Sequence, residues 1–543
     1  MTASLLFVAL NSLLIADAWR SELYPRDWEP PGEEKAFYTD KIIQDFSYAG
    51  YRRGEASIPN LVGPIFDVVA DFNADPTGAR SSTQAIQAAI DAAEAAGGGV
   101  VYLPAGTFKV SPGSRSAALR VNRSGVVIRG AGPGVTFLFN DSTQMRKKRV
   151  IDFDGSVSKG PVIALTGDLP SPTRFIPVSD TSALNVGDFV FIGFKFNNPW
   201  IAEHGQQEWW NESDGAPADG GYYREILRID HDAKVLEIDI PTRYSLFMRH
   251  GAYITRLTGV LHTVGVENLS IGNREIPEEG TSHSDWNENA HRDSSKPAYH
   301  THGSFFIEIN DARDGWIRNV HSYQPAVNQT PVHVLSNGIK ISRSFRITLQ
   351  NCLLQNPQFG GGGGNGYLYR LSGSGDNLIK NCEARRSRHG LVVSGASTTG
   401  NVFFKCIDRF TATQVAGNGR TNGSNSDSHQ HFSHSNLFDQ CVAEESAWEA
   451  KHRGPWGSIK HALTAAHQVY WNMRGEGSRG ILVRSEQGRY GYIIGTSGTR
   501  HGVKNGTPGN TAPADHVEGV NDGADLIPAS LYLDQFAKRS SGF

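Results

Sequence analysis

A short phrase that ends in cysteine recurs four times in the second half of the chain. The phrases are ITLQNC, NLIKNC, VFFKC and NLFDQC, and they end at Cys352, Cys382, Cys406 and Cys441. Successive cysteines are 30, 24 and 35 residues apart. Apolar and polar residues alternate within each phrase before a turn signal, as in half-buried strands. A repeat of this length predicts a stack of similar coils.

Each repeat is too short to bury its own apolar face, so each must stack on its neighbours. Related phrases without cysteine lie at 266–270, 316–320 and 469–472, which extends the stack in both directions. Stacking places the four cysteines at equivalent inward positions in successive coils. We therefore expect a column of buried thiols rather than a set of disulfides.

Residues 66–110 predict a strand, a turn, a helix, a glycine turn and a second strand. Ser81 or Ser82 can cap the helix, whose apolar stripe is formed by Ile86, Ala89, Ile90 and Ala93. Glycines 97–99 end it. An open first coil would expose unpaired strand edges, so we expect this helix to cover the end of the stack.

The segments DFNADPTG, TQAIQAAIDAA and GGGVVYLPAGTF resemble the N-terminal signature of the pectate-lyase superfamily. The chain differs at 81–83, where family members often carry acidic residues before the threonine. Through the coil phrases the resemblance extends over residues 60–515, and IPASLYLDQFAKR is similar to the tail of such proteins. It implies an all-β chain folded as a right-handed parallel β-helix solenoid with an N-terminal capping helix, acting on a polysaccharide.

The expected organisation of the chain has four parts and one insertion. The parts are a signal peptide at 1–18, an N-terminal extension at 19–60, the parallel β-helix at 61–515 and a C-terminal tail at 516–543. The first apolar stretch ends in Ala-Asp-Ala, typical of a signal-peptidase site, which predicts a secreted, extracellular protein. Seven Asn-x-Ser/Thr sequons fit a secreted glycoprotein. Alternating strands outside the coil rhythm predict an inserted β meander at about 173–245.

The charge of the chain limits its partners. Its 543 residues carry a net charge of −3, which argues against nucleic acid as the main partner, because phosphate binding needs a broad basic surface. No segment after the first is apolar enough to cross a bilayer, so we expect no membrane partner. We expect a monomer. Any anionic ligand must be bound by a local cluster of basic residues.

Such a cluster is present on three successive coils, at 385–389, 429–434 and 451–467. The predicted catalytic residues are Arg388, His389, His429, His431, Lys460 and His461. The predicted substrate-binding residues are Arg385, Arg386, Tyr367, Tyr369, Lys451 and Arg453. For each of these, a purely structural role, as a turn contact, a solvated charge or a satisfied core histidine, is the alternative.

These residue types suit β-elimination on a uronic-acid polymer. The reaction needs a cation on the carboxylate, a base for the C5 proton and an acid for the leaving oxygen. Arginine pairs with carboxylates through two parallel bonds, and histidine, lysine or arginine near other cations can act as a base. A neighbouring histidine or tyrosine can be the acid. We therefore expect a secreted lyase whose partner is an acidic polysaccharide.

Two other functions stay open at this stage. A glycoside hydrolase would need two carboxyl groups beside the scissile bond. Its candidates on the same coils are Asp408, Asp427, Asp439, Glu444, Glu445 and Glu449. The coil could also be a non-catalytic carbohydrate-binding or adhesion module, because a fold does not fix a function.

No cofactor is clearly indicated. The resemblance implies that Ca²⁺ can replace one cation, but acidic residues with convincing ligand spacing are lacking, and Glu444 and Glu445 are weak candidates. His429, His431 and His434 could hold a transition metal, although their spacing is not specific. The metal therefore stays unknown.

Overall fold

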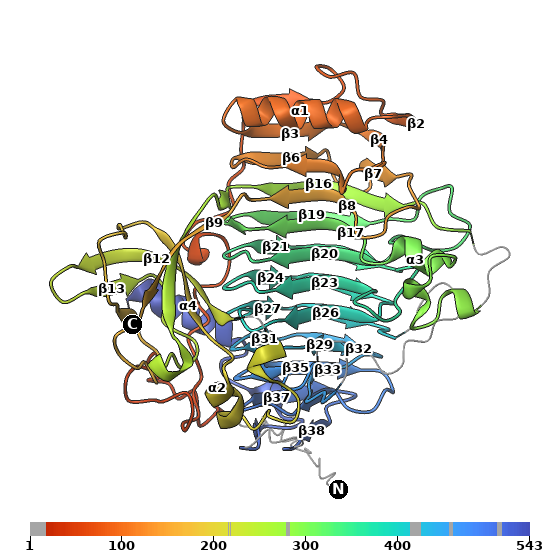
Figure 1. Ribbon diagram of the computed structural model, residues 1–543. Helices are drawn as coiled ribbons and strands as arrows, with labels where there is room; N and C mark the ends of the chain where they lie inside the picture. Colours follow the sequence, from red (N-terminus) through yellow and green to blue (C-terminus); the bar gives the residue numbers. More distant parts are fainter. Residues whose placement is uncertain are drawn as a thin grey trace, which may run out of the picture.

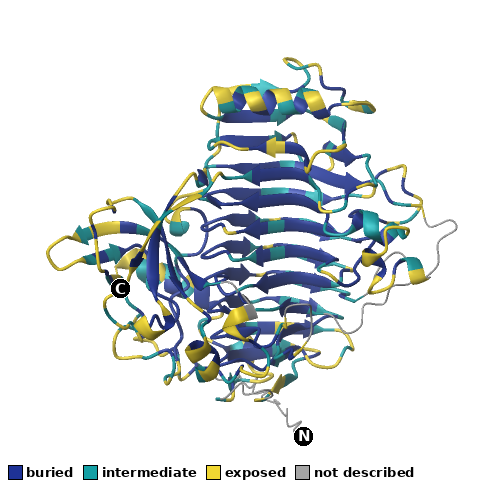
Figure 2. Cartoon of the chain, in the orientation of Figure 1, coloured by how far each residue is buried: buried dark blue, intermediate teal, exposed yellow. Residues whose placement is uncertain are grey.

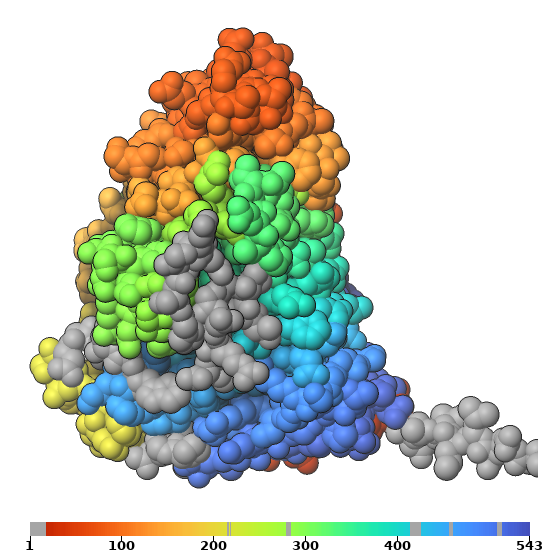
Figure 3. Space-filling model, turned by 90° about the vertical axis from the view of Figure 1, so that its right-hand side faces the viewer, coloured from red at the N-terminus to blue at the C-terminus, as the bar shows by residue number. Residues whose placement is uncertain are grey.

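The computed structural model describes residues 18–214, 217, 219–277, 283–412, 425–455, 460–507 and 513–542. All of the predicted signal peptide except its last residue lies outside this range. Parallel strands stack into a long coil, and the colours in Figures 1 and 3 show that chain position advances along its axis. The predicted parallel β-helix is confirmed.

The coil has three faces, and one of them is formed by a ten-stranded parallel sheet. Its strands are β5 (Ala117–Val121), β8 (Arg149–Asp154), β17 (Phe305–Asn310), β20 (Asn337–Ser342), β23 (Tyr367–Ser372), β26 (His389–Ser394), β29 (Ser426–Ser428), β33 (Trp448–Ala450), β36 (Val483–Ser485) and β38 (Val503–Asn505). We call it the ten-stranded sheet.

The other two faces join into one nineteen-stranded sheet, since the long strands β16 (Gly265–Asn273), β19 (Trp316–Ser322) and β35 (Val469–Glu476) belong to both. The first face adds β1 (Ile65–Asp67), β3 (Gly99–Leu103), β6 (Val126–Gly130), β21 (Thr348–Gln350), β24 (Leu378–Lys380), β27 (Val402–Phe404), β31 (Leu437–Asp439), β37 (Tyr492–Gly498) and β39 (His516–Glu518). The second adds β2 (Thr77–Ser81), β4 (Gly106–Val110), β7 (Thr136–Asn140), β22 (Leu353–Gln355), β25 (Glu383–Arg385), β28 (Ile407–Arg409) and β32 (Val442–Glu444). Two short parallel pairs, β15 (Leu261–His262) with β18 (Ala312–Arg313) and β30 (Ser433–His434) with β34 (Ala465–Ala466), lie at a corner.

The interior is a continuous apolar core. All four cysteines are free and buried in it, so the predicted column of thiols is confirmed. Tyr369 also lies in this core, where its hydroxyl donates a 3.0 Å hydrogen bond to the carbonyl of Glu383. Its side chain is therefore part of the core rather than of a binding surface, contrary to the role expected from the sequence.

Helix α1 (Thr83–Ala95) lies at the N-terminal end of the stack (Figure 1). The expected stripe, Ile86, Ala89, Ile90 and Ala93, is fully buried against the first coils. Ser82 occupies the N-cap position, but its hydroxyl donates to the carbonyl of Asp75 instead of accepting a bond from the helix. Its side chain therefore fixes the preceding turn.

The insertion is an antiparallel six-stranded sheet that projects from one side of the coil (Figure 1). Its strands are β9 (Ser158–Ala164), β10 (Phe175–Pro177), β11 (Phe189–Phe194), β12 (Gly220–Asp230), β13 (Val235–Ile238) and β14 (Tyr253–Thr258). It thus begins earlier and ends later than 173–245, because β9 and β14 pair with each other. Trp200 in α2 (Asn198–Glu203) and Trp210 pack with Phe432 of the coil, so these rings attach the insertion instead of facing solvent.

The N-terminal extension and α4 (Leu531–Ser541) cover the outer side of the first face over its later coils. Tyr24, Trp28 and Phe46 pack there against Leu378 and Val402. Trp19 forms a bridge with Leu526, which joins the two ends of the described chain. A loop that carries α3 (Pro297–Thr301) lies on the opposite side of the coil from the insertion (Figure 1). No helix in the described ranges is long and apolar enough to span a membrane.

Candidate active site

A group of titratable side chains lies at the ten-stranded sheet, on or next to β23, β26 and β29. Tyr367 and His389 begin their strands and are paired in register. Asp427 lies within β29, and His429 follows it two positions later, on the same side of the strand. The strand GLVVSG follows His389 because Leu391 and Val393 supply the core in this coil.

Tyr367, His429 and Asp427 form a connected hydrogen-bonded relay. The Tyr367 hydroxyl is 2.9 Å from Nε2 of His429, and Nδ1 of His429 is 2.9 Å from Oδ2 of Asp427. An Asp427 carboxylate favours the Nδ1–H tautomer of His429, which leaves Nε2 to accept a proton from the tyrosine. The His389 ring lies 5.0 Å from the rings of both Tyr367 and His429, and its Nδ1 is 3.4 Å from Asp427 Oδ2.

Cationic side chains surround this relay. Nη2 of Arg453 is 2.5 Å from Oδ2 of Asp427 and 2.5 Å from Oε1 of Glu449. Lys451 approaches the same Glu449 oxygen at 3.3 Å. Arg388 donates to the carbonyl of Gly361 at 2.9 Å, and its charge acts on both histidines of the relay. The site therefore combines buried imidazoles with guanidinium groups.

The environment sets the protonation states needed for acid–base chemistry. Burial holds the pKa of His389 and of His429 well below the ordinary value, and neighbouring arginines lower both further. Burial, with the charge of Arg453, lowers the pKa of His461 to about 4. Burial also raises the pKa of Tyr367. Near neutral pH the site thus holds neutral imidazoles, which accept protons, beside a protonated phenol, which donates one.

Two further predicted histidines extend the group. The His461 ring is 5.0 Å from that of His429, and the His431 ring is 6.3 Å from that of His461. Lys460 is exposed instead, and its ammonium lies 3.4 Å from the carbonyl of Glu208 on the insertion. The structure therefore places Lys460 with the attachment of the insertion and not with the relay.

The basic stretch 385–389 is divided between two faces of the coil. Arg385 lies on β25, on the second face of the nineteen-stranded sheet, and is 2.6 Å from Glu383. Arg386 is exposed at the following turn, 5.5 Å over the Phe410 ring. Only Arg388 and His389 reach the candidate site. The turn between the faces separates residues that are neighbours in sequence.

Sequence reasoning did not assign the orienting roles of Asp427 and Glu449. Both were considered as acids of a hydrolase, whereas each accepts a bond from Arg453. The available signal was the Asp-x-His spacing of 427 and 429 on one strand, which puts both side chains on the same side.

One group of possible metal ligands coincides with the relay. Nδ1 or Nε2 of His389 and His429 and a carboxylate oxygen of Asp427 lie within 4.8 Å of one another. Two imidazoles and one carboxylate suit a transition metal better than Ca²⁺, which prefers oxygen ligands. Arg453 already places a positive charge beside Asp427. The other such group within the described ranges, Glu22, His516 and Glu518, is remote in sequence from the site.

One family model and several curated proteins are similar to parts of this chain. Residues 66–169 match the family model of Rhamnogalacturonase A/epimerase, pectate lyase-like. Mannuronan C5-epimerase AlgE6 of Azotobacter vinelandii is 49% identical over 130 residues, which are 24% of this chain and 12% of that protein. Alginate lyase 7 of the same organism is 49% identical over 71 residues, 13% of this chain and 8% of that protein. The chain spans 4% to 13% of the length of the curated relatives it matches.

Solved structures with a related arrangement have low sequence identity. The tailspike protein gp49 from Pseudomonas phage LKA1 has a TM-score of 0.48 and 13% identity, over 80% of this chain and 64% of that chain. The A-module of mannuronan C-5 epimerase AlgE4 from Azotobacter vinelandii has a TM-score of 0.34 and 12% identity, over 84% of this chain and 100% of that chain.

Proposed function

We propose, on the premise that this chain belongs to the pectate-lyase superfamily of β-helix proteins, that it modifies a uronic-acid polysaccharide by removing the proton at C5. The observation that carries this proposal is the Tyr367–His429–Asp427 relay, with His389 beside it and Arg388 and Arg453 around it. These residues supply a base, an acid and cations in one place.

Each group has a task that follows from its chemistry. The C5 hydrogen of a uronate is acidic because the adjacent carboxylate can take up the charge, and a guanidinium from Arg388 or Arg453 stabilises that charge. A neutral imidazole of His389 or His429 accepts the C5 proton. The Tyr367 phenol, kept protonated by burial, donates a proton.

The fate of the resulting electron pair defines the reaction. In a lyase, the pair forms a C4–C5 double bond, the C4–O bond breaks, and the leaving oxygen takes the proton from the acid. In an epimerase, a proton returns to C5 on the opposite face and no bond of the chain breaks. We propose the lyase first. Epimerisation is the second candidate, favoured by the mannuronan C5-epimerases among the similar proteins.

A glycoside hydrolase fits this site less well. Its general acid must be a protonated carboxyl group. Asp427 and Glu449 each accept a charge-assisted bond from the same Arg453 guanidinium. The two carboxylates nearest the relay thus serve to orient His429 and Arg453.

One experiment separates these outcomes. Polymannuronate, polyguluronate and polygalacturonate are incubated with the protein in D₂O. Ultraviolet absorbance from a C4–C5 double bond is expected for a lyase, and inverted C5 carrying deuterium, seen by NMR, for an epimerase. Tyr367→Phe and His429→Ala should abolish either signal, while Arg385→Ala should keep it. New reducing ends without double bonds or deuterium would contradict the proposal.

We also propose that the protein is secreted, as the apolar first residues predict. The expected result is accumulation of the protein in the culture medium with its N-terminus at Trp19, measured by N-terminal sequencing. Retention inside the cell with the first residues intact would contradict it.

A further inference from the structure

Arg370 is a cation beside the relay to which the proposed function gives no task. It lies on β23, in register with Val392 of β26, and Val392 is in register with Asp427 of β29. Two strand spacings, about 9.6 Å, therefore separate Arg370 from Asp427 on the outer side of the ten-stranded sheet. The central carbon of the Arg370 guanidinium is 5.5 Å from the centre of the Tyr367 ring. Burial is the main cause of the lowered pKa of His429, and the charge of Arg370 adds to it.

The guanidinium of Arg370 makes few contacts with the protein. Its Nη2 is 3.5 Å from the Ser394 hydroxyl, and its Nε is buried without a hydrogen-bond partner among the described residues. In the part of the chain that the structure describes, no carboxylate forms an ion pair with it. A half-buried charge without a partner costs free energy, and positions that carry such a cost are typical of functional sites.

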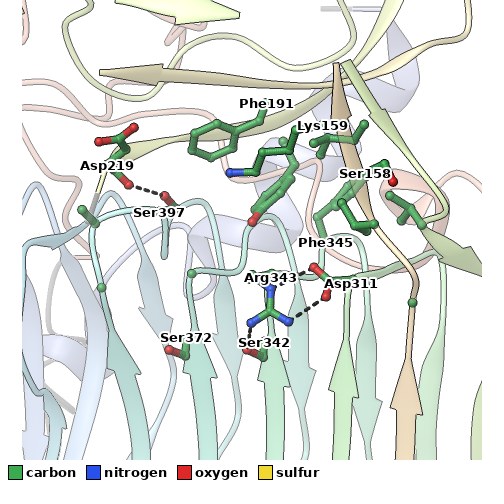
Figure 4. A pocket seen from close by; sticks show the side chains of 18 of the residues that line it. Ser158, Lys159, Phe191, Asp219, Asp311, Ser342, Arg343, Phe345, Ser372 and Ser397 are labelled. Carbon is green, nitrogen blue, oxygen red and sulfur yellow. Dashed lines mark hydrogen bonds and ion pairs between the residues drawn. The ribbon is translucent and has the colours of Figure 1, made fainter. Parts of the chain in front are cut away.

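The other arginines on the strands of this sheet have acidic partners. The pairs are Arg120 with Asp152, Arg149 with Glu308, and Arg484 with Glu486. Arg343, just beyond β20, donates two hydrogen bonds to Asp311, of 2.9 and 2.6 Å, in a pocket of about 920 Å³ between the insertion and the sheet (Figure 4). The lack of an acid at Arg370 is therefore a property of this position and not of the sheet.

The cations that surround the relay are already paired. Their ion pairs join Arg388 to Glu288, Lys451 to Glu449, and Arg453 to both Asp427 and Glu449. A substrate carboxylate that approached one of these cations would have to compete with the acid already bound there. Arg370 has no such acid among the described residues. It is thus the arginine of the site that is best prepared to receive a carboxylate from outside.

We infer that Arg370 binds the carboxylate of the reacting uronate, and that the protein therefore selects ionised uronates over their methyl esters. This inference rests on the proposed function and names the carboxylate contact within it. A guanidinium can donate two parallel hydrogen bonds to the two oxygens of a carboxylate, and a methyl ester cannot accept this ion pair.

The position of Arg370 connects this contact to the reaction. C5 bears the carboxylate, so binding at Arg370 places the C5 hydrogen next to the Tyr367 hydroxyl and the neutral imidazoles. When the C5 proton leaves, the electron pair moves toward the carboxylate, and the charge of Arg370 stabilises it there. Arg388 and Arg453 keep their acids and act on the same charge without direct contact.

Kinetics on polymannuronate, polyguluronate and polygalacturonate, each as the ionised polymer and as its methyl ester, give the first test. Arg370→Gln should lower kcat/KM on the ionised polymer by about 10²-fold and on the ester by less than about threefold. Arg370→Lys restores the charge without the paired donors and should recover about tenfold of this loss. Arg386→Gln removes an exposed guanidinium from a turn on another face, and it should change neither value by more than about twofold.

Equal losses on the ionised polymer and on the ester would overturn the inference, because a merely structural role affects both substrates. An unchanged kcat/KM on the ionised polymer would overturn it as well. Thermal unfolding shows which variants are folded. If Arg370→Gln is not, Arg370→Lys must show the selective loss on the ionised polymer, of about tenfold.

Binding measures the same contact without catalysis, and it decides the question if the esters are not turned over. Tetramers of mannuronate, guluronate and galacturonate, and their methyl esters, are titrated by calorimetry into Tyr367→Phe protein with and without Arg370→Gln. The second substitution should weaken binding of the ionised tetramer by about tenfold or more and of the ester by less than about threefold. An equal loss, no loss, or no binding of any tetramer overturns the inference. A selective loss in a protein whose unmodified form is inactive on every uronate polymer would reject the proposed function and keep Arg370 as a carboxylate-binding residue.

Discussion

The outer side of the ten-stranded sheet and the outer side of the first face of the nineteen-stranded sheet are built on the same coils with opposite chemistry. On the first face, a column in register reads Leu378, Val402, Leu437, Val469 and Tyr492. On the ten-stranded sheet, a column reads Glu308, Lys340, Arg370, Val392, Asp427 and Glu449. The extension and α4 cover the apolar column. The chain thus uses its own N-terminal extension and α4 to bury one side, whereas the other side carries a column of mostly charged residues. Figure 2 shows how far the residues of the coil are buried.

The largest effect is expected from breaking the relay at the ten-stranded sheet. Tyr367→Phe removes the proposed acid and His429→Ala one of the two proposed bases, and each should lower kcat by about 10²- to 10⁴-fold. Initial rates on the best uronate polymer measure this. Denaturant unfolding should show both variants folded. A kcat within a factor of about three of the unmodified protein, in either variant, would remove that residue from the mechanism.

Substitutions where α4 packs on the first face should lower the stability of the protein instead of its activity. Leu531 is fully buried in α4, and Leu531→Ala should lower the free energy of unfolding by about 2–5 kcal/mol. Leu533 on the same helix is 47% exposed, so Leu533→Ala is the matched control and should cost about 0.5 kcal/mol or less. Urea unfolding measures both, and kcat of the folded protein should be unchanged. Equal losses in the two variants would mean that α4 does not cover the column through Leu531.

A buried carboxyl group beneath α4 should make the free energy of unfolding depend on pH. Asp439 accepts bonds from the Ser530 hydroxyl and the Tyr532 amide, and burial raises its pKa to about 7. The pKa of Asp439 in the folded protein lies above its unfolded value of 3.8, so the protonated carboxyl contributes to the free energy of unfolding. This contribution is complete below pH 4 and is lost as the pH rises to 7. Asp439→Asn should flatten the fall in unfolding free energy between pH 4 and 7. An identical pH profile in both proteins would contradict this assignment.

The activity of the candidate site at the ten-stranded sheet should also depend on pH. Because the pKa values of His389 and His429 are lowered, the base stays neutral in moderately acidic solution. The acidic limb of kcat/KM should therefore lie below pH 6.5, the value of free imidazole. Arg453→Gln removes a cation that lowers both pKa values and should move the limb upward by about one pH unit. A limb at or above pH 6.5 in the unmodified protein would reject these histidines as the base.

The smallest effect is expected from the arginines that belong to neither side of this comparison. Arg385→Ala and Arg386→Ala should change kcat/KM by less than about twofold, because both lie on the second face or its turn. Arg388→Ala, three residues along, should reduce it strongly. Equal effects at all three positions would mean that the whole basic stretch acts as one patch.

The coil itself could be predicted from the sequence because its signals are local and repeated. The phrases ending at Cys382 and Cys406 fix one strand per coil, and the inward position of each thiol follows from strand alternation. The stripe through Ile86 and Ile90 likewise located a helix whose partners could only be the first coils.

The site could be predicted in part, because residues close in sequence separate at coil corners. His389 and His429 could be identified from the high density of basic and imidazole residues in the sequence, although their contact depends on strands that lie one coil apart. Arg385 was assigned with Arg388, but the turn at Arg386 sends them to different faces. Tyr367 and Tyr369 lie two positions apart on β23, so strand alternation does not distinguish them; Tyr369 packs in the core and only Tyr367 reaches His429. The pocket between the insertion and the ten-stranded sheet could not be predicted, since it depends on how the insertion docks.

The bridge between Trp19 and Leu526 has a consequence for synthesis on the ribosome. The extension is synthesised before the coil, yet Ile42 donates to the Tyr492 hydroxyl and Phe46 to Gln535, which lie 450 and 489 residues later in the chain. Tyr24, Trp28 and Phe46 must therefore stay uncovered while nearly the whole chain is made. The extension can therefore reach its native packing only after α4 has been synthesised.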